Sequence, residues 1–166
     1  MDTLSHYLWT VPLYWQHPKR WLLGLAGAVP DLLSFGPVFL MHLANGFHIG
    51  NGPPPLSSIP SWVPLAYSIT HSLILCALAL GLLWLWKPTL PLLLLGWPLH
   101  ILVDLPTHTT QFYPTPLLWP ISDWRYSGFS WGTPWFMVAD AIALVGVYAW
   151  LVWKVPRTSS STAATN

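Results

Sequence analysis

Apolar residues gather in long runs along this chain, and polar or proline- and glycine-rich segments separate the runs. A helix needs about twenty apolar residues to cross the hydrocarbon core of a bilayer. Four runs of about that length lie near residues 21–43, 62–86, 89–105 and 134–154, and a shorter apolar piece, 4–17, precedes them. The pattern predicts an all-α fold: a polytopic integral membrane helix bundle with four full spans plus a shorter N-terminal helix.

Interruptions of the pattern predict the loops and one broken helix. The motif Val29-Pro30-Asp31 lies inside the first long run, so we expect a broken or kinked helix there, because proline removes a helical hydrogen bond. Residues 45–61 are predicted to form a loop, and 106–133 an irregular segment. Residues 1–157 are therefore expected to form a single membrane domain, followed by a disordered polar tail, 158–166.

The composition supports a membrane protein. Charged residues make up only 7% of the chain and Glu is absent, whereas soluble domains carry about 25% charge. Many of the 13 Trp lie near the ends of the apolar runs, as in the aromatic belts of membrane proteins. A net charge of +1 predicts no nucleic-acid partner. The single Cys76 excludes an internal disulfide, and no basic region precedes the first apolar stretch, so no cleavable signal peptide is expected.

The basic residues predict the orientation in the membrane. Cytoplasmic loops carry an excess of Lys and Arg. Five of the six basic residues fall on one side of the predicted spans, namely Lys19, Arg20, Lys87, Lys154 and Arg157. That side and the C-terminus are therefore expected to be cytoplasmic. The N-terminus, both long loops and Arg125 are expected on the opposite face.

The ionisable residues inside the spans are predicted to meet in one layer. Counting about 1.5 Å of rise per helical residue from the basic residues places each of them about 16–26 Å above the basic side. They are His6, Asp31, His71, His100, Asp104 and Asp140. Such groups are costly in lipid and must be paired, hydrated or bound to metal. The layer lies towards the outer leaflet.

The spacing of His100 and Asp104 points to a metal site. Residues four apart on a helix share a face, so the two side chains can chelate one ion. Imidazole and carboxylate suit one divalent ion, zinc first, with manganese or iron as alternatives. His108 continues the spacing, but Pro106 intervenes, which makes His108 a secondary candidate.

Several short motifs also carry a resemblance to a known family. In order along the chain they are Ser5-His6, Pro30-Asp31, "THSL" at 70–73, "LHILVD" at 99–104 and "LWPISDWRYS" at 118–127. The set is similar to that of the bacterial membrane-bound metal-dependent hydrolases, described as LexA-binding, inner-membrane-associated hydrolases. The similarity covers most of residues 1–140.

The resemblance implies a multi-helix fold in the bacterial inner membrane, a bound divalent metal and hydrolase activity. The positions of the family type are His6, Asp31, His71, His100 and Asp104. The chain departs from the family at Leu33, where a second Asp is frequent, and at 66–69, where the family has His-Arg-Gly. Without the second carboxylate, one metal ion is expected rather than two.

Each candidate residue also has a simpler interpretation. His71 could be a packing histidine that bonds a neighbouring carbonyl, and Asp31 could cap a half-helix after Pro30. His6 could be an interfacial residue. Asp140 could orient a ligating histidine or accept a proton. Arg125 could face lipid headgroups or bind an anionic substrate.

The leading hypothesis is a metal-dependent hydrolase that acts on a lipidic ester or phosphoester. His71, His100 and Asp104 would hold the metal, Asp31 and His6 would complete the site, and Asp140 or Asp31 would take the proton. A non-catalytic subunit of a larger membrane complex, with a structural metal, haem or proton-relay site, is the alternative. A small transporter is a third hypothesis. Membrane lipids, and a homo-oligomer or larger assembly, are the expected partners.

Overall fold

The computed structural model describes residues 1–44 and 55–154. The all-α prediction is confirmed, because these residues contain helices and one isolated β-bridge but no strand. The elements are α1 (Thr3–Thr10), η1 (Val11–Tyr14), α2 (Arg20–Leu23), α3 (Leu25–Ser34), α4 (Gly36–Ala44), η2 (Leu56–Ser58), α5 (Val63–Thr70), α6 (Leu73–Trp86), α7 (Leu90–Leu93), α8 (Gly96–Thr107) and α9 (Pro134–Lys154). Several of the apolar runs are divided between two helices, so the arrangement is not a simple bundle of single-helix spans.

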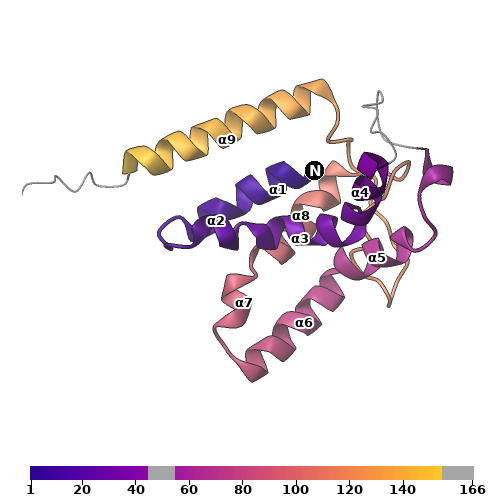
Figure 1. Ribbon diagram of the computed structural model, residues 1–166, viewed down its shortest axis with the longest axis horizontal. Helices are drawn as coiled ribbons and strands as arrows, with labels where there is room; N and C mark the ends of the chain where they lie inside the picture. Colours follow the sequence, from indigo (N-terminus) through magenta and orange to yellow (C-terminus); the bar gives the residue numbers. More distant parts are fainter. Residues whose placement is uncertain (45–54, 155–166) are drawn as a thin grey trace, which may run out of the picture.

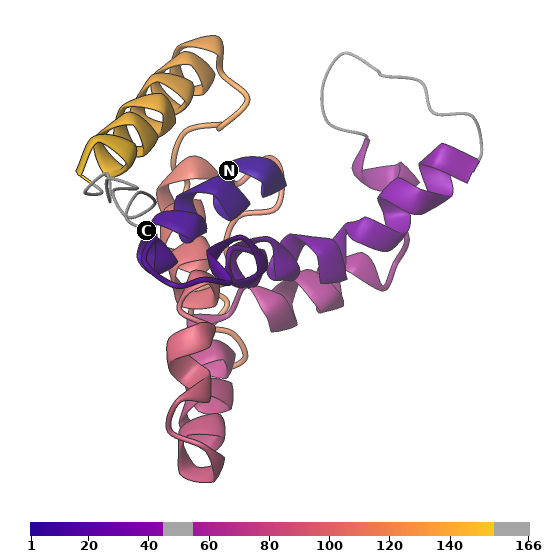
Figure 2. The same ribbon diagram turned by 60° about the vertical axis from the view of Figure 1, so that its left-hand side comes forward.

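Helix α3 lies at the centre of the molecule and packs against α1, α5 and α8 (Figure 1). Helices α6 and α7 form a hairpin that projects from this centre, as Figure 2 shows. Helix α9 lies along the outside of α1. The crossing of α1, α3 and α8 is therefore the place where segments distant in sequence meet.

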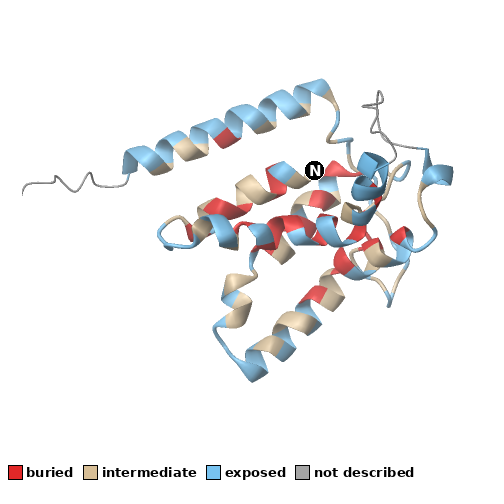
Figure 3. Cartoon of the chain, in the orientation of Figure 1, coloured by how far each residue is buried: buried red, intermediate tan, exposed pale blue. Residues whose placement is uncertain are grey.

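The interior of this protein is unusually polar and its exterior unusually apolar. Buried residues concentrate where α1, α3 and α8 meet, whereas α9 is almost wholly exposed (Figure 3). Buried side chains include four histidines and two aspartates, while Leu85 and Trp153 are 87% and 82% exposed. Large exposed apolar surfaces occur where a protein meets lipid or a partner.

Helix α9 has the same bounds as the predicted run 134–154 and is long and apolar enough to cross a membrane, which points to membrane association. Two bent helix pairs, Arg20–Ser34 with Gly36–Ala44 and Val63–Thr70 with Leu73–Trp86, also pass this test when each is counted as one span. The described residues thus offer one to three candidate spans, and the predicted four-span bundle is not confirmed.

The break in the first run lies later than the sequence indicated. Helix α3 continues through Pro30 to Ser34, and the bend of 64° falls between Ser34 and Gly36. Pro37 explains the new position, since its ring cannot donate to the Leu33 carbonyl and clashes with it in a continuous helix. Asp31 therefore lies inside a helix, and its interpretation as the cap of a half-helix is wrong.

The run 62–86 was expected as one helix but is bent by 57° between α5 and α6. Ser72 has an extended backbone and its hydroxyl accepts a hydrogen bond from the Leu75 amide, so it caps α6. The Leu73 amide bonds the Leu117 carbonyl instead of continuing the α5 helix. The bend leaves His71 at the C-terminal end of α5.

The other two predicted runs, 4–17 and 89–105, agree in part with the helices of the structure. The piece 4–17 is short, as expected, and forms α1 and η1. The run 89–105 is divided between α7 and α8, and α8 extends past Pro106 to Thr107. From there to α9 the segment is irregular, as predicted. Part of the predicted loop 45–61, residues 45–54, and the predicted tail 158–166 lie outside the described residues.

Two glycines allow the central helices to approach closely. A Cβ on Gly96 would lie 2.6 Å from the backbone nitrogen of Gly27 and 2.5 Å from Cγ2 of Thr10. A Cβ on Gly27 would lie 2.6 Å from the His6 carbonyl oxygen. Backbone atoms cannot move aside as flexible side chains do, so both positions require glycine. This contact sets how closely α1, α3 and α8 meet.

We expect Gly96→Ala to destabilise the protein by about 1–3 kcal/mol, because the added methyl group overpacks a backbone crossing. The matched control is Gly146→Ala in α9, where nothing lies within 4 Å of an added Cβ. That change should be neutral or stabilising by up to about 1 kcal/mol, as for glycine in other helices. Thermal unfolding in detergent measures both, and equal midpoints for the two variants would contradict the close crossing.

Candidate metal centre

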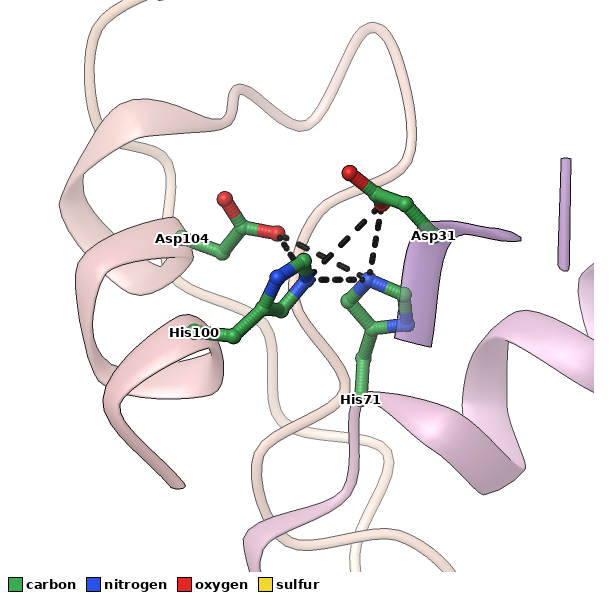
Figure 4. A group of neighbouring side chains, drawn as sticks. All are labelled: Asp31, His71, His100 and Asp104. Carbon is green, nitrogen blue, oxygen red and sulfur yellow. Dashed lines mark hydrogen bonds and ion pairs between the residues drawn. The ribbon is translucent and has the colours of Figure 1, made fainter. Parts of the chain in front are cut away.

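Four buried side chains from two helices and the end of a third converge near the α1–α3–α8 crossing. Asp31 comes from α3, His71 from the end of α5, and His100 and Asp104 from successive turns of α8. Figure 4 shows their polar atoms pointing towards one another. One ligand atom of each lies within 4.8 Å of those of the other three. We call these four residues the metal group.

The spacing of the metal group matches the edges of a coordination tetrahedron. Donors about 2.0–2.1 Å from a zinc ion are about 3.3 Å from one another. The Nε2 atoms of His71 and His100 are 2.9 Å apart. Oδ2 of Asp104 lies 3.2 Å from Nε2 of His100 and 3.6 Å from Nε2 of His71. Oδ1 of Asp31 lies 3.4 Å and 3.7 Å from the same nitrogens of His71 and His100.

Hydrogen bonds on the far side of each ring assign the histidine tautomers. Nδ1 of His100 is 2.7 Å from the Gly27 carbonyl oxygen, and Nδ1 of His71 is 3.2 Å from the Tyr67 carbonyl oxygen. A carbonyl only accepts, so in each neutral ring the proton is on Nδ1 and the Nε2 lone pair faces the other residues of the group. Backbone carbonyls hold metal-binding histidines in the same way.

The chemistry of these donors fits a divalent cation. Two Nε2 lone pairs that face each other cannot form a hydrogen bond unless a proton lies between them. Oδ2 of Asp104 is buried and has no hydrogen-bond partner, although it faces both imidazoles. A cation among the four atoms would satisfy all of them at once, and two nitrogens with two carboxylate oxygens suit zinc, manganese or iron.

Two further predicted residues lie beside the metal group through Asp104. Nε2 of His6 on α1 is 2.8 Å from Oδ1 of Asp104, and the His6 ring lies 3.7 Å from that of His100 between centroids. Nε2 of His108 is 3.4 Å from the same Oδ1. The amino group of Met1 also contacts this oxygen. Asp104 therefore faces the metal group with Oδ2 and a second set of nitrogens with Oδ1.

The other two predicted residues have different partners. Asp140 on α9 accepts hydrogen bonds from the Ser5 hydroxyl at 2.8 Å and from the Trp9 indole nitrogen at 2.7 Å. Arg125 lies in the irregular segment, and its guanidinium donates to the Trp124 carbonyl at 3.2 Å. The contacts of Asp140 tie α9 to α1, and those of Arg125 are local.

Sequence reasoning missed the groups that orient the ligands. The Gly27 carbonyl holds His100, and no sequence signal identifies a backbone acceptor. The Thr3 hydroxyl donates to Oδ2 of Asp31 at 2.8 Å. Tyr67 stacks on His71 with centroids 3.8 Å apart. Its position one helical turn before His71 could have marked it as a neighbour.

No family model, curated protein or solved structure matches this chain. The resemblance to membrane-bound hydrolases therefore rests on the motifs themselves.

We expect added zinc to raise the melting temperature of chelator-treated protein. A ligand at about 100 times its Kd stabilises the folded state by about 2.7 kcal/mol, which corresponds to a rise of several degrees. The rise should be absent in His71→Ala, which loses a donor. It should remain in His42→Ala, which removes an exposed histidine on α4. Equal rises in both variants would show that zinc binds elsewhere.

Asp140→Leu should lower the stability by about 1–3 kcal/mol, because the partly buried Ser5 hydroxyl and Trp9 indole in α1 lose their acceptor. Metal content should stay unchanged, since the contacts of Asp140 lie outside the metal group. Thermal unfolding and elemental analysis separate the two effects. Ile142→Leu, at a position 68% exposed on α9, is the control. Loss of metal in Asp140→Leu would contradict a role confined to the helix contact.

Proposed function

We propose that this protein is a membrane-embedded metal-dependent hydrolase that acts on a lipidic ester or phosphoester. The observation that carries the proposal is the convergence of two carboxylates and two Nε2 atoms that face each other in a buried group. Ionisable groups placed among apolar helices are costly, so such a cluster is kept for binding or chemistry. Zinc is the proposed ion, with manganese and iron as alternatives.

A divalent ion held here would supply a water of lowered pKa and polarise the scissile group. Hydrolysis adds the hydroxyl of water to the acyl carbon or phosphorus, breaks the ester bond, and gives the remaining hydrogen to the leaving oxygen. The chain must therefore hold a proton during the reaction. Asp31 suits this step when it is not a ligand of the ion, because Thr3 bonds only Oδ2, Oδ1 is then open to the proton, and Asp31 is 7% exposed, the most accessible of the metal group.

Asp140 is less suited to accept the proton, because both of its oxygens already bond α1. The fixed ring positions of His71 and His100 would keep the donors in place during turnover, since each ring is held from behind by a carbonyl. Pre-organised donors need no rearrangement as charge develops.

A lipidic substrate is favoured by the surface that surrounds the site. Apolar side chains are exposed on nearly every helix around the buried metal group. An apolar acyl chain would be stabilised by contact with this surface on its way to the site, whereas a polar soluble metabolite would not. Arg125, on the irregular segment, would meet an anionic headgroup.

The proposed placement is the bacterial inner membrane, with four spans, a cytoplasmic C-terminus and the site towards the outer leaflet. One feature that supports this orientation is that Arg20 and Lys154 line the same open groove, so basic residues from distant segments share one end of the molecule. Membership in the membrane-bound hydrolase family is part of the same proposal. This membership is supported by the gathering of the five family-type residues at one place, namely His6, Asp31, His71, His100 and Asp104.

A non-catalytic subunit with a structural metal is the second candidate, and one observation favours it. Four protein donors would occupy all four positions of a tetrahedral ion, whereas catalytic zinc sites keep one position open for water or substrate. In that case the ion would stabilise the fold and turnover would be absent.

The activity test uses detergent-purified protein loaded with zinc and presented with short-chain lipid esters and phosphoesters in mixed micelles. We expect hydrolysis that falls at least about a thousand-fold in His100→Ala and Asp104→Ala, because the ion is lost, and persists in His42→Ala. Chelation should abolish it and zinc should restore it. Unchanged turnover in both site variants would sink the hydrolase assignment, and bound zinc without turnover on any ester would support the structural role.

A further inference from the structure

Both carboxylate oxygens of Asp104 face histidine nitrogens. Oδ2 faces His71 and His100, whereas Oδ1 faces His6 and His108. The side chain of Asp104 is completely buried, and His6 and His108 are 2% and 8% exposed. A carboxylate between two sets of imidazole nitrogens is the arrangement that bridges two cations.

A backbone carbonyl orients the His108 ring, as in the histidines of the metal group. Its Nδ1 lies 2.9 Å from the Tyr113 carbonyl oxygen. The neutral ring therefore carries its proton on Nδ1 and directs the Nε2 lone pair towards Oδ1 of Asp104. Tyr113 adopts a positive φ of 46°, a costly conformation for a residue with a side chain. The irregular segment thus fixes the His108 ring through the Tyr113 carbonyl, whose backbone is conformationally constrained.

The atoms around Oδ1 already hold a positively charged group. The Met1 amino group contacts Oδ1 of Asp104, lies 3.0 Å from Oγ1 of Thr107 and lies 3.1 Å from Nε2 of His108. The Thr107 hydroxyl donates its own proton to the Val103 carbonyl, so it accepts from the amino group. All three atoms therefore act as acceptors towards this place, and a divalent ion that binds there takes the place of the Met1 amino group.

We propose that the chain binds a second divalent ion, held by Oδ1 of Asp104 with His6 and His108 and bridged to the first ion through the Asp104 carboxylate. The proposal rests on the proposed function, because the first ion in the metal group is part of it. His108 thereby changes from a secondary candidate to a ligand of its own site.

Leu33 does not argue against a second ion. The expectation of a single ion came from the missing second Asp at this position. Leu33 is 60% exposed on α3, whereas Asp31 on the same helix is buried in the metal group. A carboxylate at position 33 would therefore point away from both ions. The residues that complete the second site come from α1 and from the end of α8.

A pair of ions narrows the substrate class. Two-metal sites are characteristic of enzymes that cleave phosphoesters, where the two charges stabilise the attacking and the leaving oxygen. Among the lipidic substrates considered above, a phosphoester then fits better than a carboxylic ester. In its hydrolysis the water oxygen bonds phosphorus, the P–O bond to the alcohol breaks with its electron pair on the alcohol oxygen, and that oxygen takes a proton.

The test measures metal stoichiometry, which does not depend on activity. Full-length protein with a C-terminal affinity tag is chelated, reloaded with excess zinc, separated from free metal and analysed by elemental mass spectrometry. We expect two zinc ions per chain in the wild type and one in His108→Ala. His42→Ala should keep both, and Asp104→Ala should lose both. His108→Gln repeats the measurement in a side chain of similar size, and size-exclusion profiles show which variants are folded.

Manganese provides a second readout. Two Mn²⁺ ions that share a carboxylate are magnetically coupled, so wild-type protein should show a coupled electron paramagnetic resonance spectrum. His108→Ala should show the six-line spectrum of an isolated ion. One ion per chain in the wild type, with the isolated-ion spectrum and no change in His108→Ala, would overturn the second site and leave the metal group intact. No bound metal at all would overturn both this inference and the proposed function.

Discussion

The buried carboxylate of Asp104 is the interaction on which the rest of the structure depends. Transferring a charge from water into an apolar interior costs several kcal/mol unless partners compensate it. Two of its partners come from distant parts of the chain, His6 on α1 and His71 at the end of α5, and a third, His108, follows at the end of α8, which also carries Asp104. The helices can meet at this point only because Gly27 and Gly96 let their backbones approach closely. Electrostatic compensation and close packing thus require the same crossing.

The irregular features of the fold serve this crossing. The bend between α5 and α6 leaves His71 at a helix end, and the Ser72 hydroxyl donates to the Trp119 carbonyl in the irregular segment. Further along, the amides of Gly128 and Phe129 bond the carbonyls of His108 and Pro106. A side chain at Gly128 would overlap the Pro106 carbonyl oxygen, so this close return also requires glycine. The long segment between α8 and α9 is therefore packed onto the site, where it positions ligands through its backbone.

Polar side chains are concentrated inside the protein and apolar side chains on its surface. Aspartate and histidine side chains are buried at the centre, while leucines and tryptophans cover the outside. In a lipid environment a polar interior cannot be solvated from outside, so its groups must satisfy one another or bind ions. This constraint is consistent with a cluster in which backbone carbonyls orient the rings of His71 and His100. A metal ion held by this group would stabilise the fold as well, whether or not the site turns over a substrate.

The sequence by itself determined the helical class, the bounds of α9, the short N-terminal helix and the irregular character of the segment before α9. These features follow from local hydrophobicity and proline content, which act over neighbouring residues. The sequence also indicated that ionisable residues of separate helices meet, and His6, Asp31, His71, His100 and Asp104 do gather in one place. Only the tertiary structure decided that Asp140 pairs with α1, that His108 turns towards Asp104, and that the breaks fall at Phe35 and His71–Ser72. Those outcomes depend on the rotation of each helix and on backbone carbonyls from other segments, and neither is encoded in the spacing of residues along one helix.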